Sequence, residues 1–129
     1  MSKAYDYLKK TGTFYIATVE GDQPRVRPFG GLADIDGKTY ITLNKTKKVF
    51  AQLIANPKVE LCGMYEGSNW VRISAKVVHD DSDATRAKVL EQNPNLGNMY
   101  KADDGIFAVF YLTEVSGKAE SFGGAIEEF

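Results

Sequence analysis

The segment Thr42–Val49 places three lysines, Lys45, Lys47 and Lys48, where a predicted strand ends and a predicted helix begins. The first turn of a helix has N–H groups without intrahelical partners and the positive end of the helix dipole, so cations are normally disfavoured there. Three cations at this position are favourable if an anion binds between them, and phosphate is the natural candidate. The alternative is a solvated helix start with Thr46 as its N-cap, and the sequence leaves both interpretations open.

Arg25 and Arg27 lie two residues apart on another predicted strand, so their side chains share one face. Two like charges on one face are unfavourable unless they are solvated or bind an anion. The region from Arg25 to Lys48 carries a surplus of four positive charges, and the region from Asp103 to Phe129 has an excess of five negative charges. This asymmetry favours a local anion site over a generally basic surface.

Several other kinds of site are excluded by residue counts. The chain has one cysteine, Cys62, and one histidine, His79, so neither a disulfide framework nor a metal site is expected. We predict that Cys62 is a small core residue of a strand and that His79 lies in a loop. Trp70 is either a core residue or an exposed ring that stacks on a flat ligand. No nucleophile-elbow pattern occurs, so we assign no catalytic triad.

The elements that must position these residues are mostly strands. Asp36-Gly37 is the strongest hairpin signal and joins a strand at Gly31–Ile35 to one at Lys38–Leu43. Later strands are expected at Trp70–Val78 and Ile106–Val115, with a weaker one at Gly117–Phe122. Helices are expected over residues 2–10, near Val49–Ile54, and from a cap at Asp81 or Ser82 to Gln92. Because the strands do not alternate regularly with helices, we predict a mainly β fold, a small closed β-barrel of six or seven antiparallel strands with flanking helices.

The length of 129 residues predicts a single domain over 1–129, and 43% hydrophobic residues are enough for a core. No apolar run approaches the 18 residues or more of a membrane span. The segment Met1–Lys10 is polar, which predicts no secretory signal and a cytoplasmic protein. The net charge of −1 argues against general binding to nucleic acid.

Five short motifs follow one another along the chain: Arg25-Val26-Arg27-Pro28-Phe29-Gly30-Gly31, Tyr40-Ile41-Thr42-Leu43-Asn44, Lys47-Lys48-Val49, Leu53-Ile54-Ala55-Asn56-Pro57 and Trp70-Val71-Arg72-Ile73. Their order and spacing resemble the pyridoxamine 5′-phosphate oxidase-like proteins over nearly the whole chain. The fold of that family is an FMN-binding split β-barrel, which the resemblance implies for this chain.

The resemblance also implies a homodimer with two FMN molecules at the subunit interface. It implies that one strand lies along the isoalloxazine, a strand end flanks the ribityl chain, and a helix start holds the phosphate. The strand along the isoalloxazine would be Arg25, Val26, Arg27, Pro28 and Phe29. The strand end at the ribityl chain would be Thr42, Leu43 and Asn44, and the helix start at the phosphate would be Thr46, Lys47 and Lys48. By the same resemblance, Trp70 and Arg72 of the partner subunit approach the ring from its other side, and the last strand, up to Phe122, closes the pocket.

An oxidoreductase that reduces or oxidises a small organic molecule through bound FMN is the function that the resemblance implies. Small relatives of this size include general stress proteins and nitroimidazole-resistance-like reductases. The chain departs from the true vitamin B6 oxidases, which carry a longer C-terminal part with basic and histidine residues for the substrate phosphate. Here the tail Gly123–Phe129 is short and acidic, so pyridoxamine phosphate is not the expected substrate.

Three alternatives remain open at this stage. The first is an FMN-binding protein without turnover, which would act as a flavin store or a redox sensor. The second is a relative that binds deazaflavin F420, and the third is a nucleic-acid-binding β-barrel, against which the acidic last quarter of the chain counts. Haem would need an axial ligand, for which His79 is a poor candidate. No side chain stands out as a general acid or base.

Overall fold

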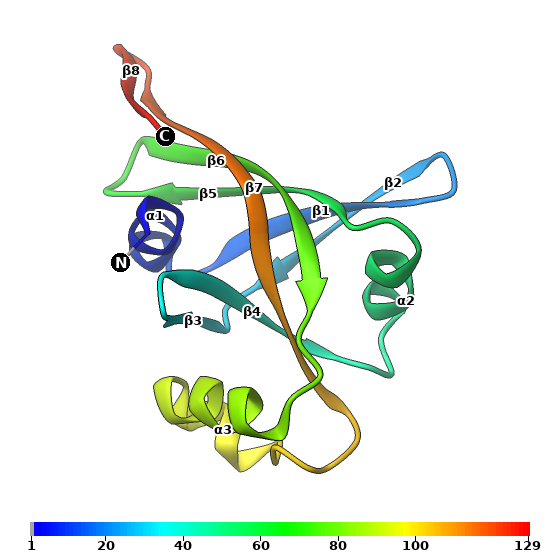
Figure 1. The fold of residues 1–129 in the computed structure, drawn as a ribbon. Coiled ribbons are helices and arrows are strands. Elements are labelled where there is room, and N and C mark those ends of the chain that lie inside the picture. The colour runs from blue at the N-terminus through cyan, green and yellow to red at the C-terminus, as the bar shows by residue number, and fades with distance from the viewer. Residues whose placement is uncertain (1) are drawn as a thin grey trace.

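The structure is a computed structural model that describes residues 2–129. Three α-helices and one short 3₁₀ helix accompany eight strands (Figure 1). The helices are α1 (Lys3–Thr11), α2 (Lys48–Ala55), α3 (Asp83–Gln92) and the 3₁₀ helix η1 (Pro94–Asn98). The strands are β1 (Phe14–Glu20), β2 (Gln23–Phe29), β3 (Leu32–Ile35), β4 (Lys38–Asn44), β5 (Lys58–Tyr65), β6 (Asn69–His79), β7 (Phe107–Ser121) and β8 (Gly124–Glu128).

All strand pairs are antiparallel and belong to one sheet, in the order β2-β1-β5-β6-β7-β4-β3, with β8 paired to β7. The mainly β prediction is therefore confirmed, but the prediction of six or seven strands is wrong. The prediction of a closed barrel is also wrong, because β2 and β3 are consecutive in the chain yet stand at the two ends of the sheet order. Pro24 and Pro28 cannot donate ladder hydrogen bonds, and β2 accommodates both because it is an edge strand.

The most important difference from the sequence prediction concerns β7. The two strands expected at Ile106–Val115 and Gly117–Phe122 form one strand of 15 residues. Its pairing with β6 shifts register between Ser74 and Lys76, and Glu114 has φ of 52°. This irregularity bends the strand pair without ending it, so a single strand serves two parts of the curved sheet.

Most of the acidic tail forms the strand β8. Phe129 exchanges two backbone hydrogen bonds with Gly117, and its ring stacks on Tyr7 of α1 at 5.4 Å between centroids. The Tyr7 hydroxyl donates to Glu127 at 2.6 Å, and this bond is the main reason that the pKa of Tyr7 is raised to about 12. The tail thereby fastens β8 to α1.

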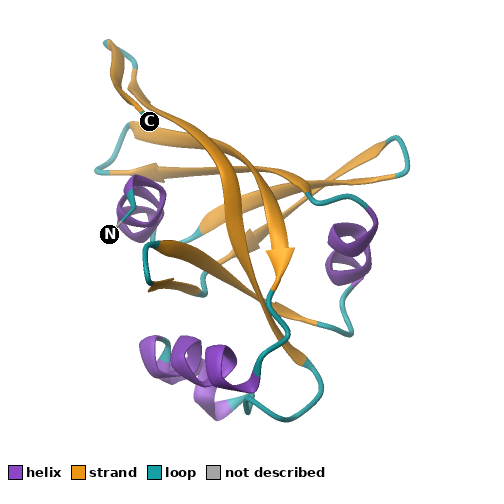
Figure 2. Cartoon of the chain, viewed as in Figure 1, coloured by secondary structure: helices purple, strands orange, loops and turns teal. Residues whose placement is uncertain are grey.

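The main core lies inside the curved sheet and consists of inward side chains such as Ile16, Leu61 and Ile73, which are fully buried. A second cluster lies beneath α3, where Val89 of this helix packs with buried residues of β3, β4 and β7, among them Phe107. Figure 2 shows the helices outside the sheet, with α1 and α2 on two sides and α3 against β3. None of the helices in residues 2–129 is long and apolar enough to cross a bilayer.

The single cysteine and the single histidine lie elsewhere than expected. Cys62 is only partly buried, because alternation along β5 turns it to the outer face of the sheet. His79 is the last residue of β6 rather than part of a loop, and its ring stacks on Phe110 with centroids 4.9 Å apart. Burial lowers the pKa of His79. Both predictions about the placement of these residues are therefore corrected.

Gly31, between β2 and β3, allows two elements to approach closely. A Cβ atom added at Gly31 would overlap the side chain of Thr42 on β4 and would lie only 2.9 Å from the Cβ of Thr42. We expect Gly31→Ala to lower the free energy of unfolding by about 1–3 kcal/mol, because the overlap is with atoms near the backbone. Urea unfolding of Gly31→Ala and of Gly97→Ala, where a Cβ meets open space, measures the difference. Equal stability of the two variants would contradict this close approach.

Candidate functional site

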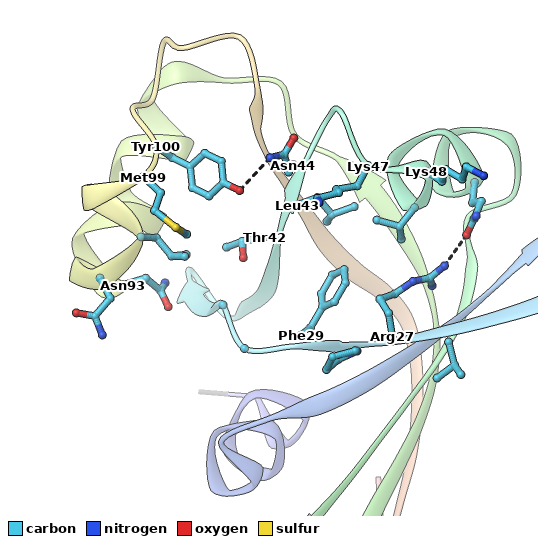
Figure 3. A pocket seen from close by; sticks show the side chains of 18 of the residues that line it. Arg27, Phe29, Thr42, Leu43, Asn44, Lys47, Lys48, Asn93, Met99 and Tyr100 are labelled. Atoms are coloured by element: carbon cyan, nitrogen blue, oxygen red, sulfur yellow. Dashed lines mark hydrogen bonds between the residues drawn. The ribbon is translucent and has the colours of Figure 1, made fainter.

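A cavity of about 960 Å³ opens between three parts of the fold, namely β2, the β4–α2 junction and the α3–η1 segment (Figure 3). Ten of its lining residues were proposed as site residues from the sequence: Arg25, Val26, Arg27, Pro28, Phe29, Thr42, Leu43, Asn44, Lys47 and Lys48. The others include Glu20, Gly30, Gly31, Val49, Gln52 and a group from α3 and η1. The structure thus brings together side chains from the strand and from the helix start that the sequence singled out separately.

The β2 wall follows the expected two-residue period. Arg25, Arg27 and Phe29 share the face that β1 presents inward at Phe14 and Ile16, since their register partners are Thr18, Ile16 and Phe14. Phe29 packs against Phe14 with ring centroids 6.3 Å apart. The two arginines nevertheless differ in their partners.

Arg25 is exposed and forms an ion pair with Glu20 at 2.9 Å. The hydrogen bond from Arg25 holds the pKa of the Glu20 carboxyl below its usual value. The charge of Arg25 is therefore compensated within the protein, although the pair is exposed and contributes little to stability.

Arg27 is partly buried and is held by uncharged acceptors. Its Nη1 donates to the Thr18 hydroxyl at 2.8 Å and to the carbonyl of Ile16 at 3.2 Å, and its Nη2 donates to Gln52 Oε1 at 2.6 Å. Burial is the main reason, and the charge of Arg25 the second, that the pKa of Arg27 is lowered. Arg27 is thus an oriented cation whose charge no carboxylate among these partners neutralises, which makes it suitable for an anionic ligand.

Gln52 of α2 is the residue that orients Arg27. Its Oε1 also accepts a hydrogen bond from Thr18 at 2.6 Å, and both Thr18 and Gln52 are buried, at 2% and 6% exposure. The sequence does not single out Gln52, because a glutamine within an amphipathic helix carries no pattern of its own.

We expect Gln52→Leu to lower the free energy of unfolding by about 1–3 kcal/mol, because Thr18 loses its buried acceptor and Arg27 loses one of three. Urea unfolding measures this loss. Gln23→Leu is the matched control, since Gln23 is exposed and its side chain bonds only the carbonyl of Pro24. The control should change stability by less than about 0.5 kcal/mol. Equal effects of the two substitutions would refute the role assigned to Gln52.

The β4–α2 junction differs from the sequence prediction at Thr46. Both the backbone N–H and the hydroxyl of Thr46 donate to Asn44 Oδ1, at 2.8 and 2.6 Å. The N-cap of α2 is Lys47, without a side-chain cap hydrogen bond. The alternative in which Thr46 is the N-cap is wrong, because its hydroxyl donates to Asn44, and Thr46 does not line the cavity.

Lys47 and Lys48 are exposed and line the cavity beside the uncapped start of α2. The free N–H groups of this first turn and the two ammonium groups form a donor set for an anion. Arg27 lies across from them, and its guanidinium is joined to α2 through Gln52 (Figure 3). One end of the cavity is therefore strongly cationic.

The opposite wall was not predicted from the sequence. It consists of Gln92, Asn93, Pro94, Asn95, Leu96, Met99 and Tyr100 from the end of α3, η1 and the residues after it. Asn93 fixes this wall to β3, because its amide accepts from the N–H of Leu32 and donates to the carbonyl of Leu32. The asparagines and the proline indicate a loop, but nothing in their spacing indicates that this loop faces β4.

Besides Thr46, three predicted site residues do not line the cavity: Trp70, Arg72 and Phe122. Trp70 of β6 packs against Phe122, with 5.3 Å between ring centroids. Because it is partly buried, it is neither a full core residue nor a fully exposed ring, the two interpretations left open for it. Arg72 lies 3.8 Å from Glu120 on the outer face of the sheet. Within residues 2–129, no cluster of three or more His, Cys, Asp or Glu side chains could hold a metal ion.

Comparisons with known proteins agree with this architecture. A family model described as pyridoxamine 5′-phosphate oxidase matches residues 1–113. A NimC/NimA family protein from Clostridium acetobutylicum is 50% identical in sequence and superposes with a TM-score of 0.94, covering 98% of this chain and 90% of that chain. The comparison with curated protein sequences gives no match.

More distant structures share the fold. A protein related to general stress protein 26, from Clostridium acetobutylicum, is 14% identical with a TM-score of 0.78, covering 98% of this chain and 91% of that chain. A heme binding protein from Mycobacterium smegmatis is 14% identical with a TM-score of 0.76, and the match covers all of this chain and 58% of that one. At such identities the likeness concerns the fold alone.

Proposed function

Because this chain belongs to the pyridoxamine 5′-phosphate oxidase family, we propose that it is an FMN-binding flavoprotein and an oxidoreductase that acts on a small organic molecule. The observation that carries this proposal is the cationic end of the cavity, where Arg27, Lys47 and Lys48 surround the uncapped start of α2. A phosphate monoester is the ligand group that such a donor set fits best.

The residue types along the cavity match the phosphate, the ribityl chain and the ring of FMN in that order. Lys47, Lys48, Arg27 and the N–H groups of the α2 first turn would hold the phosphate, with Thr46 next to them in the chain. The strand end Thr42–Asn44 would flank the ribityl chain, and the β2 residues from Arg25 to Phe29 would lie along the ring. Gly30 and Gly31 keep this edge free of side chains.

When bound, FMN would supply the electron transfer, and the chain would supply orientation, electrostatics and exclusion of water. Backbone N–H groups of β2 would stabilise negative charge on the pyrimidine side of the ring. Phe29, Leu43 and Leu96 line the cavity with apolar surface that displaces water. In this mechanism the protein controls which molecule reaches the cofactor, and no side chain of β2 or of the β4–α2 junction is required as a general acid or base.

We further propose that the protein is a homodimer whose cofactor sites lie at the subunit interface. The outer face of β1, β5 and β6 carries Tyr15, Met64 and the partly buried Trp70, with Tyr15 and Met64 about half exposed. Phe122 beside Trp70 is 86% exposed. An apolar surface of this kind is typical of a protein interface, and the dimer would bring Trp70 and Arg72 of the partner subunit to the cofactor.

The first test is the colour of the purified protein. Flavin absorbance bands, with a pigment that heat releases and chromatography identifies as FMN, are the expected result. A colourless protein that takes up no added FMN would refute the proposal, and uptake of deazaflavin F420 instead would replace it. Turnover of bound FMN with NADH or NADPH and an organic acceptor distinguishes an enzyme from a flavin store or redox sensor.

A further inference from the structure

The cavity has two chemically different ends. Its charged lining residues, Glu20, Arg25, Arg27, Lys47 and Lys48, all come from β1, β2 and the start of α2. The seven residues that α3, η1 and the following turn contribute, from Gln92 to Tyr100, carry no charge. If FMN phosphate occupies the cationic end, the uncharged end remains for a second molecule.

Among the partly buried residues of this uncharged wall, Asn93, Leu96 and Tyr100, only Tyr100 has a side-chain donor that forms no hydrogen bond within the part of the chain that the structure describes. The orientation of the Asn44 amide determines whether the Tyr100 hydroxyl donates or accepts the hydrogen bond between them. The backbone N–H of Thr46 can only donate, and it points to Asn44 at 2.8 Å, so the atom that it meets must be the amide oxygen. The amide nitrogen of Asn44 therefore faces Tyr100 and donates to the phenolic oxygen at 3.1 Å.

The phenolic proton of Tyr100 is consequently not used toward Asn44. Among residues 2–129, no other side chain or carbonyl forms a hydrogen bond with this hydroxyl. The phenol ring is partly buried and packs on Phe107 with centroids 5.1 Å apart, which fixes its position at the cavity wall. Figure 3 shows Tyr100 and Asn44 joined above the cavity, with Met99 and Thr42 beside them.

The hydrogen bonds form a chain with one direction. Thr46 donates to Asn44 and Asn44 donates to Tyr100, so each bond polarises the next and makes the last O–H a better donor. A ligand oxygen at the uncharged end would complete this chain. A carboxylate or phosphate is not expected there, because its charge would lose water without meeting a cation.

We propose that Tyr100 is the hydrogen-bond donor of a second ligand site in this cavity, which takes an uncharged, flat organic molecule through a carbonyl-type oxygen. The proposal rests on the proposed function, since FMN must fill the cationic end. Met99 and Leu96 supply apolar contact for the body of such a molecule. Tyr100 would thereby select molecules by the presence of an oxygen acceptor and position them, without itself undergoing any covalent change.

Two small molecules of nearly the same shape test the proposal. Indanone is flat, uncharged and carries one carbonyl oxygen, and indane lacks that oxygen. Titration of the FMN-loaded protein with each, followed by NMR line broadening, gives their affinities. Tyr100→Phe keeps the ring on Phe107 and removes only the hydroxyl, and Tyr111→Phe is the matched control, because Tyr111 lies outside the cavity.

We expect Tyr100→Phe to weaken binding of indanone roughly two- to tenfold, the value of one neutral hydrogen bond, and to leave indane and FMN affinities unchanged. Tyr111→Phe should change none of the three affinities. Indanone that binds no better to the wild type than to Tyr100→Phe, with FMN bound normally in both, overturns this inference alone. Failure of the wild type to bind FMN overturns the proposed function as well, so the two failures are distinguishable.

Discussion

Replacing Lys48 with alanine is expected to lower the affinity for FMN about ten- to a hundredfold and to leave the affinity for riboflavin nearly unchanged. Lys48 is the first residue of α2 and lines the cationic end of the cavity. A charge-assisted contact with phosphate contributes about 1.5–3 kcal/mol, which corresponds to this loss. Riboflavin lacks the phosphate and cannot make the contact. Fluorescence titration of both flavins measures the two affinities.

Lys45→Ala is the matched control for this experiment. It removes the same charge from the same junction, but Lys45 does not line the cavity, and its backbone N–H bonds the carbonyl of Ile106. A small and equal effect on FMN and riboflavin is expected. If Lys48→Ala weakens both flavins equally, or if Lys45→Ala matches it, the phosphate does not lie at the start of α2.

Met64→Glu is expected to convert a dimer into a monomer at micromolar concentration. Met64 is half exposed on β5 and pairs with Trp70 of β6, at the centre of the face proposed as the interface. A carboxylate buried there without a partner costs several kcal/mol, enough to dissociate two subunits. FMN affinity should fall roughly thirtyfold or more, because the aromatic contact from the partner is lost with the dimer. Analytical ultracentrifugation and flavin titration measure the two effects.

Ile54→Glu is the control, since Ile54 is 57% exposed but lies on α2, away from the outer face of the sheet. It should remain dimeric and bind FMN as the wild type does. A wild-type protein that is monomeric at micromolar concentration while FMN is bound would overturn both the dimer and the shared site.

Local physical chemistry explains which elements the sequence predicted well. Asp36 and Gly37 both have positive φ, at 53° and 80°, so the two-residue hairpin was recognisable from its residue types alone. Ser82 caps α3 by accepting from Thr85 N–H, as one of the two predicted caps. The period of two along β2 placed Arg25 and Arg27 on one face, because alternation is a property of any strand.

Predictions failed where distant parts of the chain compete with local preferences. Gly117 was expected near the start of a new strand, but pairing with β6 carries β7 through it, and the Phe129 ring occupies the space where a side chain would lie. A closed barrel was expected because the strands do not alternate regularly with helices, whereas closure depends on whether β2 meets β3, which no local pattern expresses.

The sequence by itself indicated the cationic residues Lys47, Lys48 and Arg27, because a helix start and strand alternation are local properties. Only the tertiary structure decided the rest of the site. Gln52 orients Arg27 from 25 positions along the chain, and Tyr100 meets Asn44 across 56 positions. The physical reason is that a hydrogen bond between distant residues depends on how helices pack on the sheet, and neither the spacing nor the type of either residue encodes that packing.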